Sequence, residues 1–121
     1  MFILVSMKSK KYYVEIVDSM NEKVTKLVKS VDNVKEVKTV IQGNNVIVGV
    51  RLNDKKREVE TTKNIQKAIQ AQLNGKKLHL ITNDRQFNRL KSIDNDLRKG
   101  GPNDELNLEI NKLIQMNNNN R

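Results

Sequence analysis

Few side chains in this sequence have the types and spacing that catalysis or metal binding requires. His79 is the only histidine and the 121 residues contain no cysteine, which excludes thiol catalysis, disulfides and thiolate metal sites within them. A lone histidine in an apolar run is more typical of a structural or exposed residue than of a zinc ligand, because zinc needs several protein ligands. The sequence therefore predicts neither a metal site nor a cofactor.

The acidic and hydroxyl residues also lack a catalytic arrangement. Asp94 and Asp96 lie two positions apart on an expected helix, so their carboxylates face different directions and cannot share a proton. Asp84 lies where a helix begins and is interpreted as its cap. The glycines form no phosphate-binding motif, and no serine lies in a nucleophile motif. We therefore expect a non-enzymatic protein without a small-molecule substrate.

The charge of the chain favours an anionic partner. Its net charge is +9 and its pI is about 9.9. Such a charge suits phospholipid headgroups, an acidic wall polymer or nucleic acid, although on the charge alone solvated surface lysines are the favoured explanation. The dense basic clusters are Lys8–Lys11 and Lys55–Arg57, and neither contains an aromatic residue that could stack on bases. Nucleic-acid binding is therefore the less favoured alternative.

Length and composition indicate one domain with an aliphatic core. Hydrophobic residues make up 36% of the chain and aromatic residues only 3%, so valine, leucine and isoleucine must form the interior. We expect residues 12–116 to form this domain. Residues 1–11 are expected to be disordered or an artificial addition, and the asparagine-rich residues 117–121 to be disordered. The apolar run Phe2–Val5 is too short for a signal peptide, or for a membrane span of ~20 residues.

The clearest pattern predicts a helix followed by a β-hairpin. Apolar residues recur at helical spacing from about Tyr13 to Val31. Two valine-rich strands then flank a turn at Gly43–Asn44 or Asn44–Asn45, and only such an even-numbered loop keeps both valine rows on one face. These rows are Val37, Thr39 and Ile41 on one strand, and Val46, Val48, Val50 and Leu52 on the other.

Four further elements are predicted after the hairpin. They are a helix over about Arg57–Leu73, a strand over Leu78–Thr82, a helix from Asn83 or Asp84 to the stop at Lys99–Pro102, and a helix from Asn103 or Asp104 to about Met116. The inward residues of the first of these helices are predicted to be Val59, Ile65, Ala68, Ile69 and Leu73. The fold class is α+β: an α-β-β-α-β core with two helices on one face of a three-stranded sheet, plus a C-terminal helical extension. The predicted strand order is 2-1-3, with every neighbouring pair antiparallel.

The other face of the sheet carries a second apolar patch. Val40, Ile47 and Ile81 are predicted to lie together there, and Gly49 leaves room beside them for a close neighbour. Such a face needs a cover, which could be the C-terminal helices, a second copy or a partner. If the C-terminal helices form the cover, the residues that touch the patch should be Leu106, Ile110, Leu113 and Ile114.

Several short motifs in this order resemble the YhcN/YlaJ family of sporulation lipoproteins. The resemblance begins with "VDNVKEV" and continues with "QGNNVIVGVRLND", which contains the signature residues Gly43, Asn44, Val48, Gly49 and Val50. Asp84 and Arg89 follow within "NDRQFNRL". Gly100 and Pro102 end a helix, and "NDELNLEINKLIQ" begins the last one. These motifs cover about Val14 to Met116.

The resemblance implies a small non-enzymatic domain with a fold similar to the BON domain, made during sporulation and held at the inner membrane of the spore. The contexts it implies are spore assembly and germination. The implied partners are an anionic membrane or cortex surface, or a spore protein. The signal peptide and lipid-bearing cysteine of the family are missing from these 121 residues, so a cytoplasmic location also stays open.

Overall fold

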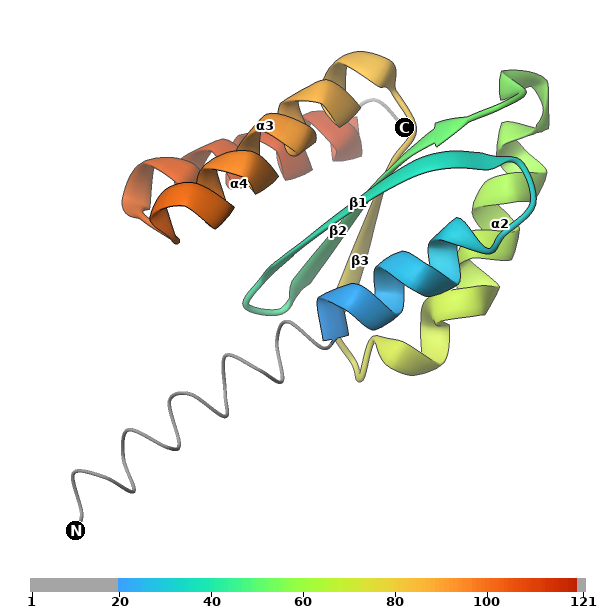
Figure 1. The fold of residues 1–121 in the computed structure, drawn as a ribbon, viewed down its shortest axis with the longest axis horizontal. Helices are drawn as coiled ribbons and strands as arrows, with labels where there is room; N and C mark the ends of the chain where they lie inside the picture. Colours follow the sequence, from blue (N-terminus) through green and yellow to red (C-terminus); the bar gives the residue numbers. More distant parts are fainter. Residues whose placement is uncertain (1–19, 120–121) are drawn as a thin grey trace, which may run out of the picture.

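The computed structural model describes residues 20–119, in which a three-stranded sheet lies between two layers of helices (Figure 1). The elements are a helix at residues 20–29 (the N-terminal helix), β1 Val34–Gln42, β2 Asn45–Leu52, α2 Glu58–Ile69, β3 Lys77–Ile81, α3 Asp84–Gly100 and α4 Asp104–Asn119. Short 3-10 turns at Lys55–Arg57 (η1) and Gln70–Gln72 (η2) flank α2. The predicted α+β class is confirmed. The part of the first predicted helix before residue 20 lies outside the described residues.

The hairpin has the predicted two-residue turn. Gln42 pairs with Asn45, which leaves Gly43 and Asn44 as the loop, and Gly43 has a positive φ of 54°. Primed hairpin turns need such a backbone, and glycine adopts it without steric cost. Opposite residues such as Val37 and Val50 therefore share one face of the sheet, as the loop parity predicts.

The predicted strand order is wrong: the sheet runs β1-β2-β3, and β3 pairs with β2 in parallel, from Asn45 opposite Lys77 to Gly49 opposite Ile81. The helix between β2 and β3 returns the chain to the start of β2, so that both strands point the same way. β2 takes the centre because residues 46–50 are buried on both faces. β1 carries charged residues, Lys35 and Lys38 among them, and suits an edge.

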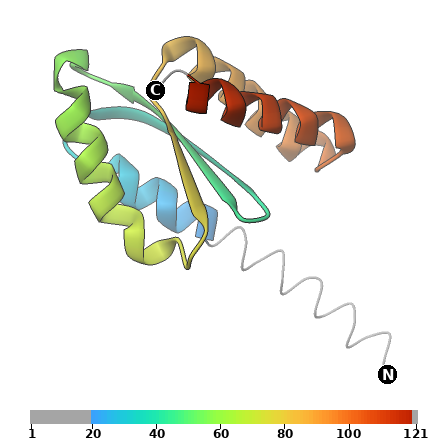
Figure 2. The same ribbon diagram turned by 180° about the vertical axis from the view of Figure 1, so that it is seen from behind.

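The N-terminal helix and α2 lie side by side over one face of the sheet (Figures 1 and 2). We call the interior on this side the valine core; its buried members are Val24, Val28, Val34, Val37, Val46, Val48, Val50, Ile65, Ile69 and Leu80. Val59 was predicted to face inward, but it is 69% exposed. Thr61 takes the inward position because it lies four residues before Ile65, on the same side of the helix, whereas Val59 lies six residues before Ile65 and therefore points to another side.

The opposite face is covered by α3 and α4, as Figure 2 shows from behind. We call the interior on this side the leucine–isoleucine core; its buried members are Val40, Ile47, Ile81, Leu90, Ile93, Leu106, Ile110 and Leu113. A side-chain carbon added to Gly49 would lie 2.7 Å from Leu90 Cδ2 and 3.1 Å from Phe87 Cδ2. The absence of a side chain at Gly49 therefore lets α3 approach β2 closely, which is the role predicted for this glycine.

The ends of the two C-terminal helices follow from local side chains. The Asn83 side chain caps α3 by accepting the Gln86 amide at 3.1 Å, and Gly101 ends the helix with a φ of 74°. Helix α4 runs to Asn119, so the prediction of a disordered tail is wrong for residues 117–119. Asn117 lies four residues after Leu113 and continues the buried stripe, which explains why the helix extends this far.

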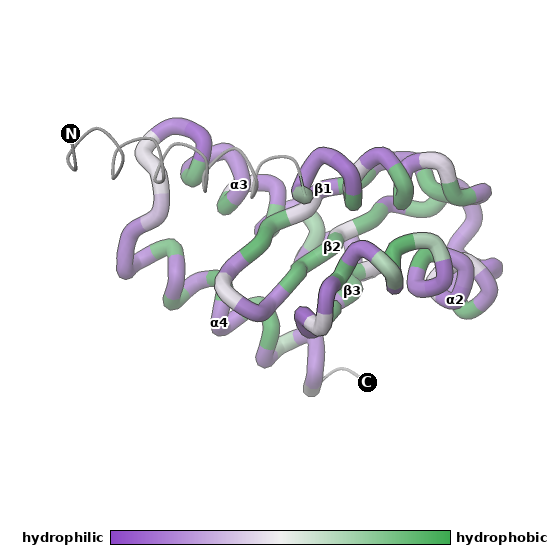
Figure 3. The backbone as a smooth tube through the Cα atoms, turned by 90° about the horizontal axis from the view of Figure 1, so that it is seen from below, coloured by the Kyte–Doolittle hydropathy of each residue, from purple (hydrophilic) through white to green (hydrophobic). Residues whose placement is uncertain are grey.

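The hydropathy of the chain follows this arrangement. Figure 3 shows hydrophobic residues along the three strands and hydrophilic residues over much of the helices. Each strand side chain points to one of the two faces, so the sheet supplies apolar surface to both helix layers. The outer surfaces of the helices and the ends of the sheet are left to carry polar function.

Candidate functional site

The signature residues do not gather into one site. Gly43 and Asn44 form the hairpin turn, Val48 and Val50 lie in the valine core, and Gly49 lies under α3. Asp84 begins α3, Arg89 is exposed on it, and Gly100 and Pro102 lie at its end. Most of these positions serve a turn, a helix end or the interior, which fits a family pattern that maintains the fold.

The predicted contact patch is formed but covered. Val40 lies directly opposite Ile47, and Val40, Ile47 and Ile81 are all at most 2% exposed. All three pack against α3 and α4, and Leu106, Ile110, Leu113 and Ile114 belong to the same cluster. The C-terminal helices are therefore the cover. The alternative of an external contact surface at these three residues is wrong, because they are inside the protein.

No group of three or more histidine and carboxylate side chains within residues 20–119 could hold a metal ion. His79 is buried in β3, where its Nε2 lies 2.9 Å from Asn45 Oδ1 on the neighbouring strand. Asp94 is buried and ion-paired with Lys38 and Arg98, whereas Asp96 is exposed. These contacts give His79 and Asp94 structural roles between neighbouring elements.

The basic cluster at Lys55–Arg57 is largely neutralised by nearby carboxylates. Lys55 Nζ lies 2.9 Å from Asp84 Oδ2, and Arg57 Nη2 lies 2.9 Å from Asp32 Oδ2. The hydrogen bond from Lys55 lowers the pKa of Asp84, and the hydrogen bond from Arg57 lowers the pKa of Asp32. Only Lys56 in this cluster has no ion pair among the described residues, so the cluster is a weaker anion site than its sequence suggests.

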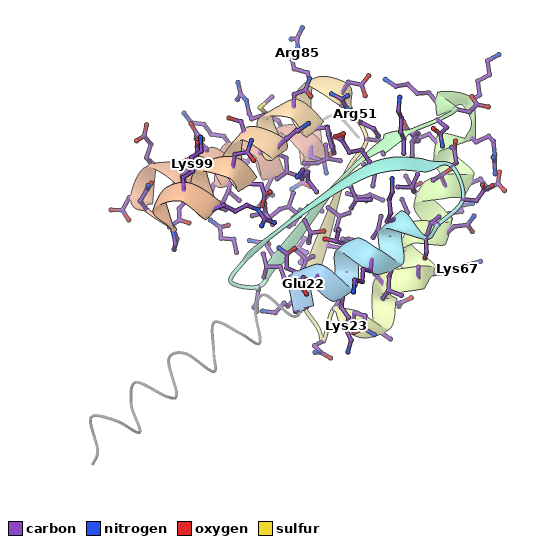
Figure 4. All side chains as sticks on the ribbon, viewed as in Figure 1. Glu22, Lys23, Arg51, Lys67, Arg85 and Lys99 are labelled. Atoms are coloured by element: carbon purple, nitrogen blue, oxygen red, sulfur yellow. The ribbon has the colours of Figure 1, made fainter. Side chains whose placement is uncertain are left out.

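The outer surface of the N-terminal helix and α2 is a second basic region, which we call the basic helix layer. Its lysines are Lys23, Lys26, Lys29, Lys63 and Lys67, against Glu22, Glu58 and Glu60. None of the five lysines makes an ion pair within the part of the chain that the structure describes. Figure 4 shows Lys23 and Lys67 at the outside of this layer. The Lys29 ammonium donates to the Lys35 carbonyl, and the ammonium groups of the other four lysines are available to an external anion.

Helix α4 has the opposite charge. It carries Asp104, Glu105 and Glu109 against a single cation, Lys112. The protein is therefore not uniformly basic, and the excess positive charge lies elsewhere than on its last helix. An anionic surface would favour the basic helix layer and would repel α4.

A polar cavity of about 490 Å³ opens where β2 and β3 end. Lys55 follows β2, while Thr82 and Asn83 follow β3, and these residues line the cavity together with the side chains of three helices. The carboxyl ends of neighbouring parallel strands meet at one edge of a sheet, which is where ligands bind in many open α/β folds. The volume lies in the range of small-molecule sites.

Oppositely charged and neutral polar groups form the cavity wall. Lys55 is engaged by Asp84, and Glu58, which also lines the cavity, has no ion pair among the described residues. Among the described residues, the only apolar side chain in the wall is Leu80. The wall therefore carries no excess of positive charge that would attract an anion.

Two residues of the cavity wall are buried side-chain amides. Gln86 is 4% exposed and Asn117 is 9% exposed, and both belong to the wall. The Asn117 Nδ2 atom is buried without a hydrogen-bond partner in the described part of the chain. An unsatisfied buried amide costs about 1–3 kcal/mol, so it marks a position where function outweighs stability or where a ligand supplies the partner.

Sequence reasoning missed this cavity. Its wall comes from η1, α2, β3, α3 and α4, and polar residues from such separated segments carry no common periodicity. One signal was present: Asn117 continues the spacing of Leu106, Ile110 and Leu113, which would have placed it inward.

The described residues contain no helix that is both long and apolar enough to cross a membrane.

The chain is similar to a known protein family over most of its length. The sequence model described as sporulation lipoprotein YhcN/YlaJ matches residues 7–116. A search of curated proteins finds no match. The matched residues include both cores, the basic helix layer and all of the cavity wall except Asn117.

Proposed function

Because this chain belongs to the YhcN/YlaJ family of sporulation lipoproteins, we propose that it is a non-enzymatic binding protein of the spore that attaches to an anionic surface, either the inner spore membrane or the cortex. The family ties the protein to sporulation. A role in spore assembly or germination is the context in which such attachment would act. The binding surface is the basic helix layer.

The observation that carries this proposal is the set of unpaired lysines on the N-terminal helix and α2. Lys26, Lys63 and Lys67 are exposed and face away from the valine core. Both helices are held rigidly by that core, so the lysines are displayed together without an ordering cost for the backbone. Each lysine close to an anionic membrane contributes about 1 kcal/mol of attraction.

Binding to vesicles tests the membrane part of the proposal. The protein should co-sediment with phosphatidylglycerol-containing vesicles at low salt and not with phosphatidylcholine vesicles. Reversal of three lysines (Lys26→Glu, Lys63→Glu, Lys67→Glu) should weaken binding about 100-fold or more, because each lysine contributes about 1 kcal/mol. A matched control reverses Arg85, Lys99 and Lys112 on α3 and α4, which changes the net charge equally. Equal losses in both triple variants would show that net charge alone acts and would remove the layer from the proposal.

Purified cortex peptidoglycan and duplex DNA complete the test. Sedimentation with peptidoglycan but not with vesicles would place the surface in the cortex. Duplex DNA that competes vesicles away, with a log–log salt slope of about −0.9 per neutralised phosphate, would favour nucleic-acid binding instead. The absence of binding to vesicles and to peptidoglycan at low salt would refute the proposal.

A further inference from the structure

We infer that the polar cavity at the ends of β2 and β3 is a binding site for a small, neutral, hydroxyl-rich molecule of the carbohydrate class. This site shares helix α2 and Glu58 with the basic helix layer but contains none of its lysines, and it does not depend on the proposed surface attachment. The inference rests on the chemistry of the wall, on the burial of two of its side-chain amides and on the unsatisfied amide of Asn117.

The wall chemistry fits hydroxyl groups. Thr62 and Thr82 supply hydroxyls, while Gln66, Asn83, Gln86 and Asn117 supply side-chain amides that can both donate and accept hydrogen bonds. Sugar hydroxyls have the same dual capacity, so one ligand could satisfy several of these groups. The Glu58 carboxylate accepts from hydroxyls but repels anions.

The charge balance excludes an anionic ligand as the preferred one. Lys55 is the only cation that residues 20–119 contribute to the wall, and its ammonium already contacts Asp84 at 2.9 Å. A phosphate or carboxylate in the cavity would meet Glu58 with one partly neutralised lysine to balance it. A neutral ligand avoids this cost.

The buried amides argue for a ligand rather than for a purely structural cavity. Asn117 is 9% exposed, and its Nδ2 has no partner within the described residues. A leucine at this position would extend the apolar stripe of Leu106, Ile110 and Leu113 without an unsatisfied group. Gln86 on α3 is a second buried amide in the wall, with 4% of its surface exposed. The other buried residues of α3 are Phe87, Leu90, Ile93 and Asp94.

The test uses the full chain and N,N′-diacetylchitobiose, a neutral disaccharide with hydroxyl and amide groups. Backbone NMR signals of Thr82, Gln86 and Asn117 should shift saturably, with an affinity in the millimolar range or tighter. Asn117→Leu and Gln86→Leu should each weaken binding at least tenfold. Asn117→Leu should also unfold at the same or a higher urea concentration than the wild type, so that lost binding cannot be attributed to lost folding.

Asn111→Leu is the matched control, because it makes the same substitution on the exposed side of α4. It should leave binding unchanged. Glucose 6-phosphate serves as the anionic comparison and should bind more weakly than the disaccharide. The inference is overturned by the absence of saturable shifts at these positions, by binding that survives both cavity variants, or by tighter binding of glucose 6-phosphate.

Discussion

The valine core and the leucine–isoleucine core share one sheet, but they are closed in different ways. On the valine side, Asn33 precedes β1 and ties three segments together: its Nδ2 donates to Thr61 Oγ1 and to the Asp54 carbonyl, both at 2.9 Å, and its Oδ1 accepts from the Asp54 amide at 2.8 Å. On the side of the leucine–isoleucine core, Leu90 and Phe87 of α3 pack closely against Gly49 of β2.

The difference reflects how each helix layer is connected to the sheet. The N-terminal helix and α2 adjoin β1 and β2 in the chain, so directional hydrogen bonds at the junction can fix their register. Helices α3 and α4 come after the sheet is complete and bind it as a pair. Apolar contact at Gly49 then does most to set their position, and the ion pair between Lys38 on β1 and Asp94 on α3 adds a polar contact to it.

Removal of α4 should have the largest effect. A chain that ends at Pro102 loses Leu106, Ile110 and Leu113, and at about 1.5–3 kcal/mol for each buried side chain the free energy of unfolding should fall by roughly 5 kcal/mol or more. Domains of this size are stable by about 5–15 kcal/mol, so the truncated chain should be close to unfolded at room temperature. Urea denaturation followed by circular dichroism measures the change. A chain that ends at Asn119 is the control, and an unchanged midpoint after truncation at Pro102 would mean that α4 does not close this core.

Loss of the Asn33 side-chain hydrogen bonds should have the second-largest effect on stability. Asn33 has a φ of 78° and is buried, whereas Asn74 has a φ of 51° and is exposed. Glycine fits both backbones, so Asn33→Gly removes only the side-chain hydrogen bonds and leaves the Asp54 amide and Thr61 hydroxyl with fewer partners. We expect a loss of about 2–4 kcal/mol at Asn33. Asn74→Gly should change stability by less than ~0.5 kcal/mol. Similar urea midpoints for the two variants would show that the side-chain hydrogen bonds of Asn33 do not stabilise the fold.

The close contact at Gly49 should give a smaller effect. Gly49→Ala places a methyl group 2.7 Å from Leu90 Cδ2, and overpacking of this kind costs about 1–3 kcal/mol. Gly100→Ala, where the added carbon meets nothing within 4 Å, is the control and should be nearly neutral. Combining Gly49→Ala with Leu90→Val should cost less than the sum of the two changes if the clash is with Leu90. Additive losses in this double-mutant cycle would place the strain elsewhere.

The exposed ion pair between the two layers should have the smallest effect. Lys55 next to α2 holds the pKa of Asp84 on α3 below its ordinary value of 3.8. The pair therefore stabilises the fold above that value, and the contribution is lost as the pH falls through the lowered pKa. Lys55→Ala should return the pKa of Asp84 to its ordinary range in a carboxyl NMR titration, with little change in the urea midpoint, because both side chains are more than half exposed. An unchanged titration of Asp84 would show that the pair does not form in solution.

The face of each strand residue could be predicted from the sequence because side chains alternate with a period of two. The even length of the loop was enough to align the valine rows and to place Val40 next to or diagonal to Ile47, and the structure shows that the two are directly opposite. The order of the strands was not fixed by this reasoning. Strand β3 has the same direction as β2, so it could pair antiparallel with β1 or parallel with β2, and the alternation of side chains fits both. The unbroken apolar run Val46–Val50 was the clue that β2 is central, since both of its faces had to be buried.

The covered patch and the cavity also differ in how far they could be predicted from the sequence. The cover over Val40, Ile47 and Ile81 was one of the predicted alternatives, because the apolar faces of the C-terminal helices and the apolar patch on the sheet can bury each other. The cavity depends on polar residues such as Thr82 and Asn117, which only the tertiary fold brings together. Their types are as common on a solvated surface, so composition and spacing give no warning of a shared site.

The central position of β2 has a consequence for how the protein opens. Val46, Val48 and Val50 belong to one core while Ile47 belongs to the other, so neither helix layer can separate completely without disturbing side chains that the other layer needs. The amide protons of β2 are therefore expected to exchange with solvent only through global unfolding, while those at the ends of α4 exchange through local fraying. Although it has two interiors, the protein should melt as a single cooperative unit.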